Sequence, residues 1–119
     1  MRARILIIDD DPRNIFALAA VLRAKGYACT SGGSAKAGLA LFDEHNDIGI
    51  VLIDMMMPDI DGYEAIPLIR QRKDIPIIAV TAQAMTGDRE KCIAAGATDY
   101  ISKPIDVDRM IQIIQTYLK

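Results

Sequence analysis

Hydrophobic residues gather into four short runs along the chain, separated by longer segments of mixed polarity. The runs cover residues 5–8, 48–53, 75–80 and 100–101, and each is bounded by charged residues, glycine or proline. The first three are rich in Ile, Leu and Val and have no polar face, which is typical of parallel strands covered by helices on both sides. Pro76 fits such a strand only near its start. The pattern therefore predicts four strands, of which the first three are buried.

One more strand and five helices are predicted in the segments between these runs. This strand, the second of five in chain order, covers Tyr27 to Thr30, whose partly polar composition suits the edge of a sheet. Helices are indicated by apolar residues at helical spacing, by residues that can cap a helix start, and by glycine stops. The first expected helix begins at Pro12 after the cap Asp11 and ends before Gly26. The second follows the cap Ser34, and the third follows the cap Asp61 and ends at about Arg70. The fourth runs from about Thr86 to Ala95, and the fifth follows the cap Asp106.

Three further details of these elements are predicted. Pro67 lies inside the third helix and is expected to kink it or to delay its start. Residues 31–34, Ser-Gly-Gly-Ser, lack the spacing of a phosphate-binding loop and are interpreted as a turn. On the fifth helix, the residues expected to face the core are Val107, Ile111, Ile114 and Leu118, with Met110, Ile113 and Tyr117 on an adjoining flank.

The alternation of strands and helices, repeated five times, defines the expected fold class. Strand–helix–strand units with right-handed crossovers build a doubly wound α/β sandwich, in which a parallel sheet lies between two layers of helices. The small five-stranded form, the flavodoxin-like fold, has the strand order 2-1-3-4-5. Ligands of such sheets bind at the carboxyl ends of the strands. The residues that follow each hydrophobic run are therefore the candidates for a functional site.

Length and composition agree with one globular domain over residues 1–119. Of the 119 residues, 51% are hydrophobic and 25% are charged, as in ordinary globular proteins. The formal net charge of −2 provides no basic field that would attract nucleic acid or an anionic membrane. Cys29 and Cys92 lack metal-binding spacing and are expected to be reduced core thiols. Only four strongly apolar residues precede Asp9, too few for a signal sequence or a membrane span, so a soluble, cytoplasmic protein is expected.

Polar residues that follow four of the predicted strands carry the candidate chemistry. Asp9-Asp10-Asp11 follows the first strand, Asp54 the third, Thr81 the fourth and Ser102-Lys103 the fifth. Neighbouring carboxylates repel one another unless a cation neutralises them, and oxygen ligands without His or Cys favour Mg²⁺. A carboxylate beside Mg²⁺ and an ammonium group suits phosphoryl transfer, in which Asp54 would be the nucleophile and would form an aspartyl phosphate.

Each of these residues also has a plainer interpretation. Asp11 precedes Pro12 directly and is interpreted as a helix cap rather than a ligand. Taken singly, Asp54 would be a loop carboxylate, Lys103 a surface lysine, and Thr81 a strand-end threonine bonded to its own backbone. Their coincidence at the predicted strand ends favours the functional interpretation.

Four motifs occur together along the chain. They are residues 7–11 (Ile-Ile-Asp-Asp-Asp), residues 52–62 (Leu-Ile-Asp-Met-Met-Met-Pro-Asp-Ile-Asp-Gly), residues 80–82 (Val-Thr-Ala) and residues 100–104 (Tyr-Ile-Ser-Lys-Pro). Their order and spacing resemble the receiver domains of two-component response regulators, and the resemblance covers essentially the whole chain. Four correlated motifs are far more specific than one motif would be.

The resemblance implies the binding roles of the site residues. Asp54 would accept a phosphoryl group from a phosphohistidine. Asp9 and Asp10 would hold Mg²⁺, together with a carboxylate oxygen of Asp54 and the backbone carbonyl of Met56. Lys103 would pair with the phosphoryl oxygens. The side chain at position 56 would therefore not need to be a ligand.

The resemblance also implies a switch that responds to phosphorylation. The added charge and acceptor oxygens would recruit the Thr81 hydroxyl and the Ala82 backbone N–H. Tyr100 would then fill the space that Thr81 vacates. The Lys103-Pro104 peptide is expected to be cis, which would aim the lysine inward.

Partners and output follow from the same resemblance. The phosphoryl donor would be a sensor histidine kinase or a histidine phosphotransfer protein, and the parent chain could be a hybrid histidine kinase. The domain would catalyse only its own phosphorylation and dephosphorylation, so it is not expected to be a conventional enzyme. Its output surface would comprise the fourth helix, fifth strand and fifth helix, where Met110, Ile113 and Tyr117 are either a partner or homodimer contact or simply the core's margin.

Three alternatives remain open on the sequence alone. A haloacid-dehalogenase-like phosphatase shares Asp-x-Asp after a strand, but its later Gly-Asp-x-x-x-Asp pattern fails because Cys92 follows Gly87-Asp88 at the required position. A flavodoxin-like electron carrier shares the architecture, but Trp is absent and aromatic cover for a flavin is scarce. A binding-only pseudo-receiver would keep the fold without being phosphorylated, and the intact acidic pocket argues against it.

Overall fold

Strands and helices alternate strictly in the computed structural model, which describes residues 3–82 and 88–118. The strands are β1 (Arg4–Ile8), β2 (Cys29–Gly32), β3 (Ile48–Asp54), β4 (Ile77–Thr81) and β5 (Asp99–Ser102). The helices are α1 (Pro12–Ala24), α2 (Ala35–Glu44), α3 (Gly62–Arg72), α4 (Asp88–Ala95) and α5 (Val107–Tyr117). Every strand and helix predicted from the sequence is therefore present.

The strands form one parallel sheet in the order β2-β1-β3-β4-β5, which confirms the predicted topology. The register aligns the carboxyl ends of the strands: Ile8 of β1 lies opposite Ile53 of β3. Asp54 in turn lies opposite Val80 of β4, and Thr81 lies opposite Ser102 of β5. The residues that end or follow these strands consequently meet at one edge of the sheet.

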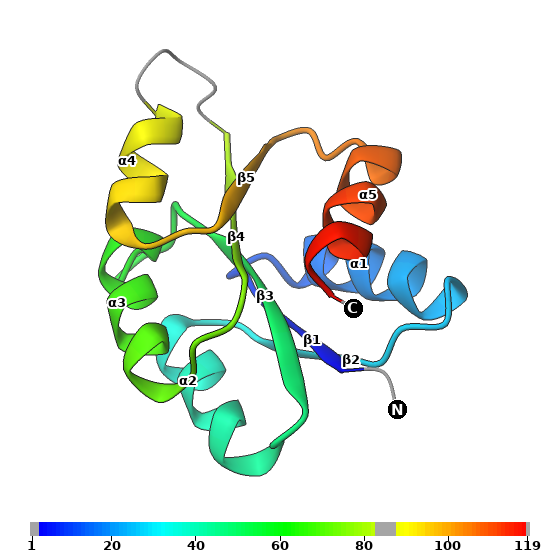
Figure 1. Ribbon diagram of the computed structural model, residues 1–119, viewed down its shortest axis with the longest axis horizontal. Coiled ribbons are helices and arrows are strands. Elements are labelled where there is room, and N and C mark those ends of the chain that lie inside the picture. The colour runs from blue at the N-terminus through cyan, green and yellow to red at the C-terminus, as the bar shows by residue number, and fades with distance from the viewer. Residues whose placement is uncertain (1–2, 83–87, 119) are drawn as a thin grey trace.

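The two faces of the sheet are covered by different helices. α1 and α5 pack on one face, and α2, α3 and α4 pack on the other (Figure 1). Successive residues of a strand point to opposite faces, so Ile5 and Ile7 belong to the α1/α5 core while Leu6 and Ile8 belong to the other core. This double cover explains why the central strands are apolar at consecutive positions rather than at alternate ones.

Side-chain caps start the helices where the sequence predicts them. Asp11, Ser34, Asp61 and Asp106 each accept a hydrogen bond from a backbone N–H in the first turn of α1, α2, α3 and α5, respectively. The expected delay at Pro67 is wrong, because α3 begins directly after its cap and continues through the proline to Arg72. Pro67 is the sixth of the eleven residues of α3, so it lies in the middle of the helix and removes one intrahelical hydrogen bond there.

β2 differs in position from its prediction. It covers Cys29–Gly32 instead of Tyr27 to Thr30, because Ser31 and Gly32 pair with Ile7 and Ile8 of β1. The interpretation of residues 31–34 as a turn is therefore wrong for the first two of them. The predicted start of the fourth helix at Thr86 lies outside the described residues, which resume with α4 at Asp88.

α5 turns a different face to the core from the one predicted. Met110, Ile113 and Ile114 are buried, and Ile113 is only 4% exposed, whereas Val107 is 39% exposed. At about 100° per residue the apolar residues occupy slightly less than half of the helix circumference. Docking onto the sheet centres the buried part of this arc on Met110 rather than on the Val107 side. Of the two interpretations of the flank, Met110 and Ile113 therefore belong to the core and are not an exposed partner contact.

Two smaller expectations can be compared with the described residues. Cys29 and Cys92 are both buried thiols and do not form a disulfide, as predicted. Among the helices described, none is long and apolar enough to cross a lipid bilayer.

Candidate functional site

Four strands bring the predicted polar residues together at one edge of the sheet. Asp9 follows β1, Asp54 is the last residue of β3, Thr81 is the last residue of β4, and Lys103 follows β5. Asp9, Asp54 and Thr81 are the polar residues buried among the described part of the chain. Burial of polar groups is costly unless they are paired, so this concentration marks the edge as a functional region.

Asp9 is held in place by its own turn and by α1. Its backbone N–H donates to the carbonyl of Gly32 at 3.1 Å, which extends the pairing of β1 with β2 by one residue. One carboxylate oxygen accepts from the backbone N–H of Asp11 at 2.9 Å, and the other accepts from the side-chain amide of Asn14. The carboxylate is thus fixed in orientation from both sides.

Asp54 accepts two hydrogen bonds in a buried position. Its Oδ1 accepts from the backbone N–H of Met56 at 3.0 Å, and its Oδ2 forms an ion pair with Nζ of Lys103 at 3.2 Å. Burial raises the pKa of the Asp54 carboxyl above its usual value, and the charge of Asp9 acts in the same direction. The N–H of Met56 and the ammonium of Lys103 oppose this rise in pKa but do not cancel it.

Lys103 reaches Asp54 because its backbone is fixed to β4. Its N–H donates to the carbonyl of Thr81 at 2.7 Å, and the Lys103-Pro104 peptide is cis, as predicted. The side chain lies across the strand ends with its ammonium beside the carboxylate and about a third of its surface in water. An incoming anion can therefore reach the lysine without unfolding the edge.

Asp9, Asp10 and Asp54 form a cluster that fits a divalent cation. Each offers one carboxylate oxygen, and the three oxygens lie within 4.8 Å of one another. Hard oxygen donors without nitrogen or sulfur suit Mg²⁺, and the exposed side chain of Asp10 leaves room for the waters that Mg²⁺ retains. The fold therefore brings together the three carboxylates that the sequence predicts as cation ligands.

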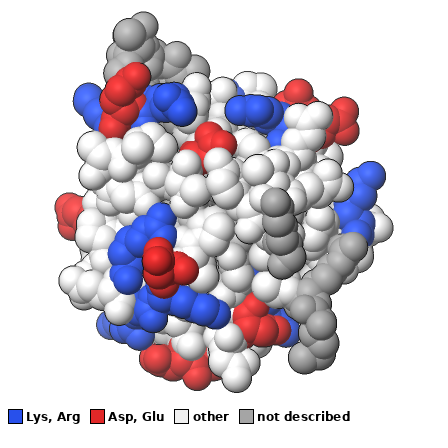
Figure 2. Space-filling view, viewed as in Figure 1, with Lys and Arg blue, Asp and Glu red and all other residues white. Residues whose placement is uncertain are grey.

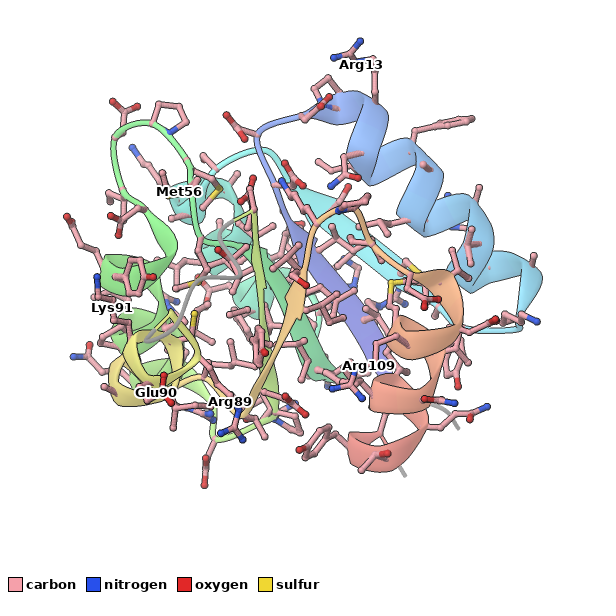
Figure 3. The ribbon with its side chains drawn as sticks, turned by 90° about the horizontal axis from the view of Figure 1, so that it is seen from above. Arg13, Met56, Arg89, Glu90, Lys91 and Arg109 are labelled. Carbon is pink, nitrogen blue, oxygen red and sulfur yellow. The ribbon has the colours of Figure 1, made fainter. Side chains whose placement is uncertain are left out.

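The remaining predicted residues lie around this cluster. Met56 is 57% exposed and lies on the α3 side of the strand ends, whereas Arg13, at the start of α1, lies on the other side (Figure 3). Ala82 is exposed directly after β4. Tyr100 lies in β5 opposite Ala79, so it shares a sheet face with Thr81 and packs against the core beneath α4. All the predicted site residues thus belong to one region.

Asn14 is a residue of the site that the sequence analysis missed. It lies in the first turn of α1, and its amide donates to the Asp9 carboxylate across five positions of the chain. An asparagine in a helix turn carries no pattern that reveals such a contact. The one indication in the sequence is the helix start at Pro12, which places Asn14 in the first helical turn, five residues after Asp9.

Sequence comparison assigns the family. Residues 5–115 match the model of the response regulator receiver domain, and the chain belongs to this family. It is 35% identical to the polar-differentiation response regulator DivK of Brucella ovis, over 99% of this chain and 98% of that protein. It is also 36% identical, over 95% of its length, to part of the signal transduction histidine-protein kinase BarA of Shigella flexneri. The matched part is only 12% of the length of that kinase.

Structure comparison agrees with this assignment. A putative response regulator from Chloroflexus aurantiacus superimposes with a TM-score of 0.89, at 29% identity and with 98% of both chains covered. The chemotaxis protein CheY4 of Vibrio cholerae superimposes with a TM-score of 0.90 over 99% of this chain, and at 23% identity this similarity supports the fold alone. The domain is thus of the regulatory type, and the phosphatase and electron-carrier alternatives lose their basis.

Proposed function

We propose that this domain is a phosphoacceptor in a histidine-to-aspartate phosphorelay, with Asp54 as the residue that is phosphorylated. The observation that carries the proposal is the buried Asp54 carboxylate, which lies in ion-pair contact with Lys103 and within one cluster with Asp9 and Asp10. A carboxylate between a cation site and an ammonium group is arranged for phosphoryl transfer, where positioning and charge neutralisation provide most of the catalysis.

The proposed reaction forms an aspartyl phosphate from a phosphohistidine. The Asp54 carboxylate attacks phosphorus, so that a P–O bond forms as the P–N bond breaks. The imidazole nitrogen keeps the electron pair of the broken bond and takes up a proton. Lys103 donates to Oδ2 of Asp54 at 3.2 Å, and its ammonium would compensate the charge of the phosphoryl oxygens.

The acidic cluster would hold Mg²⁺ during this transfer. Asp9, Asp10, a carboxylate oxygen of Asp54 and the backbone carbonyl of Met56 are the proposed ligands. Bound there, the ion supplies positive charge against the phosphoryl oxygens. The burial-raised pKa of Asp54 supports the need for a cation, because a positive charge keeps the carboxyl ionised and able to act as nucleophile.

Thr81, Ala82 and Tyr100 would convert phosphorylation into a change of surface. The Thr81 hydroxyl and the Ala82 N–H are proposed to bind the phosphoryl oxygens, and Tyr100 to move inward behind Thr81. The placement of Thr81 and Tyr100 on one face of neighbouring strands supports this link. The responsive surface would be the face that carries α4, β5 and α5, where charged side chains lie mainly around an uncharged centre (Figure 2).

The proposed donor is a sensor histidine kinase or a histidine phosphotransfer protein. The similarity to a segment of the histidine kinase BarA and to the response regulator DivK supports a partner of this class. We propose a cytoplasmic location for the exchange, and a homodimer of the phosphorylated form as one output. The −2 net charge gives no support to nucleic acid as a partner.

Intact-mass spectrometry tests the phosphoacceptor directly. The protein is incubated with Mg²⁺ and a small-molecule phosphodonor such as acetyl phosphate, and we expect one phosphoryl adduct that EDTA abolishes. Asp54→Asn should remove the adduct. Asp59→Asn is the matched control because Asp59 is exposed in the following loop and its backbone φ of 67° is one that asparagine adopts readily.

The outcomes of this experiment separate the remaining alternatives. An adduct that survives Asp54→Asn would place the phosphoacceptor elsewhere. Absence of any adduct, with either acetyl phosphate or a phosphorylated histidine donor, would indicate a binding-only pseudo-receiver. In Lys103→Ala we expect Mg²⁺ binding to persist while the response of the α4, β5 and α5 surface to beryllofluoride, a phosphoryl mimic, is lost.

A further inference from the structure

We infer that a contact between two glycines, Gly32 at the end of β2 and Gly38 in α2, positions the Asp9–Asp10 pair for the cation. This inference rests on the proposed Mg²⁺ site. The contact lies on the far side of β1 from Asp54, and neither glycine belongs to the acidic cluster. The two glycines would therefore be positioning residues that act through β1.

Gly38 occupies a helix interior where alanine would be the better helix former. It is the fourth residue of α2 and is buried. A methyl group at this position would lie 2.5 Å from Cδ1 and 2.6 Å from Cγ1 of Ile8. Ile8 is itself completely buried, so its side chain cannot turn out into solvent to make room. The helix thus forgoes favourable propensity to let its backbone approach Ile8.

Gly32 completes the same contact from the strand side. A Cβ atom on Gly32 would lie 2.6 Å from the backbone nitrogen of Gly38, which cannot yield as a flexible side chain can. The carbonyl of Gly32 accepts the hydrogen bond from the backbone N–H of Asp9 at 3.1 Å. The position of Gly32 is therefore coupled directly to the first residue of the acidic pair.

Both routes from α2 lead to Asp9. One runs from Gly38 through the side chain of Ile8, the residue that precedes Asp9, and the other runs from Gly38 through Gly32 to the Asp9 backbone. The Asp9 carboxylate is also bonded to Asp11 and Asn14. A displacement of β1 would consequently strain this whole turn, including Asp10, rather than being absorbed by rotation of one side chain.

A methyl group introduced at Gly38 tests the coupling. We expect Gly38→Ala to weaken Mg²⁺ binding about tenfold, as a lost supporting contact typically does at a metal site. The Mg²⁺ affinity is obtained from thermal unfolding over a series of MgCl₂ concentrations, without any phosphodonor. If Gly38→Ala unfolds in plain buffer, all variants are compared in sucrose, which stabilises folded proteins.

Two further variants distinguish positioning from packing. Gly33→Ala is the matched control, because a methyl group there would meet no atom within 4 Å, and its Mg²⁺ affinity should equal that of the wild type. Ile8→Ala removes both Cδ1 and Cγ1, the two atoms that a methyl group at Gly38 would approach most closely. In the Ile8→Ala background, Gly38→Ala should therefore cause little further loss of Mg²⁺ affinity.

The possible results separate the two proposals. Absence of any Mg²⁺ response in the wild type would overturn the cation site and the inference with it. A wild-type response together with equal affinities for Gly38→Ala and Gly33→Ala would overturn the inference and leave the proposed function intact. A loss of affinity from Gly38→Ala that is as large in the Ile8→Ala background as in the wild type would also overturn it. A loss in the wild type that nearly disappears in the Ile8→Ala background supports positioning through Ile8.

Discussion

Two aspartates at opposite ends of β3 experience opposite electrostatic environments. Asp47 directly precedes the strand, and a hydrogen bond of 3.1 Å from Nε of Arg4 lowers the pKa of its carboxyl. Asp54 ends the strand, and burial raises the pKa of its carboxyl although Lys103 lies beside it. The folded structure therefore favours the ionised form of the aspartate at the amino end of β3 and disfavours it at the carboxyl end.

The contrast extends to the charged groups around the two ends of the sheet. At the amino end, Arg70 donates to the carbonyls of Ile75 and Gly96 and to the hydroxyl of Thr98, and Lys73 donates to the carbonyl of Ile48 at 2.7 Å. Basic and acidic side chains lie next to one another in the lower left of Figure 2. At the carboxyl end, three carboxylates face one another instead. One end is internally satisfied, whereas the other is arranged for a ligand.

The largest expected effect on stability comes from breaking the satisfied end. Arg70→Met removes the donors to two backbone carbonyls that tie the loop after α4 to the start of β4. We expect a loss of about 2–3 kcal/mol in the free energy of unfolding, because carbonyls withdrawn from water are left without their charged donor. Urea denaturation followed by circular dichroism measures the change.

Arg72→Met is the control for Arg70→Met on the same helix. Within residues 3–82 and 88–118, Arg72 is paired only with the exposed Asp43, at 3.4 Å, so its loss should change the free energy of unfolding by less than about 0.5 kcal/mol. Equal losses for the two variants would show that the carbonyl contacts of Arg70 contribute nothing beyond those of an ordinary surface arginine.

The next effect concerns the cation at the carboxyl end. Mg²⁺ at a hundred times its Kd should stabilise the wild type by about 2.7 kcal/mol, and Asp10→Ala should lose most of this gain. Without metal, the same variant should be slightly more stable than the wild type, because one of three facing carboxylates is gone. Thermal unfolding with and without Mg²⁺ measures both differences, and equal Mg²⁺ responses in the two proteins would rule Asp10 out as a ligand.

A smaller effect is expected when the charge of Asp54 is removed in metal-free buffer. Because the pKa of Asp54 is raised by folding, its contribution to stability is complete below the unfolded value near 3.8 and is lost as the pH rises through the folded value. Asp54→Asn should therefore be more stable than the wild type at pH 7, and the difference should vanish at low pH. A lower stability of the variant at pH 7 would mean that the ion pair with Lys103 outweighs burial.

The smallest effect is expected at Asp47, with the opposite sign. The lowered pKa of Asp47 contributes stability above its unfolded value near 3.8, and this contribution is lost as the pH falls through the folded value. Asp47→Asn should be slightly less stable than the wild type at pH 7, and the two should converge in acid. Urea titrations of both asparagine variants over pH 3 to pH 7 test whether the two ends of β3 differ in the sign of their pH dependence.

Much of the fold was predictable because it depends on local patterns. The apolar runs identify the central strands, since a strand covered on both faces has few positions for polar residues. The caps Asp11, Ser34, Asp61 and Asp106 mark helix starts through contacts within one turn of chain. The site residues could be found by the same reasoning, because every parallel strand delivers its last residues to the same edge.

The tertiary structure decided what depends on contacts between distant elements. The buried face of α5 followed from docking onto the sheet: Met110 and Ile111 are both apolar, but Met110 is buried in the core while Ile111 is only partly buried against it. The extension of β2 through Gly32 depended on pairing with β1. The support of Asp9 by Asn14 and the opposite pKa shifts of Asp47 and Asp54 likewise arose from burial and from partners in space. Sequence periodicity indicates which residues are buried, but packing determines which residues they contact across the core. The ionisation of the site carboxylates depends on those contacts.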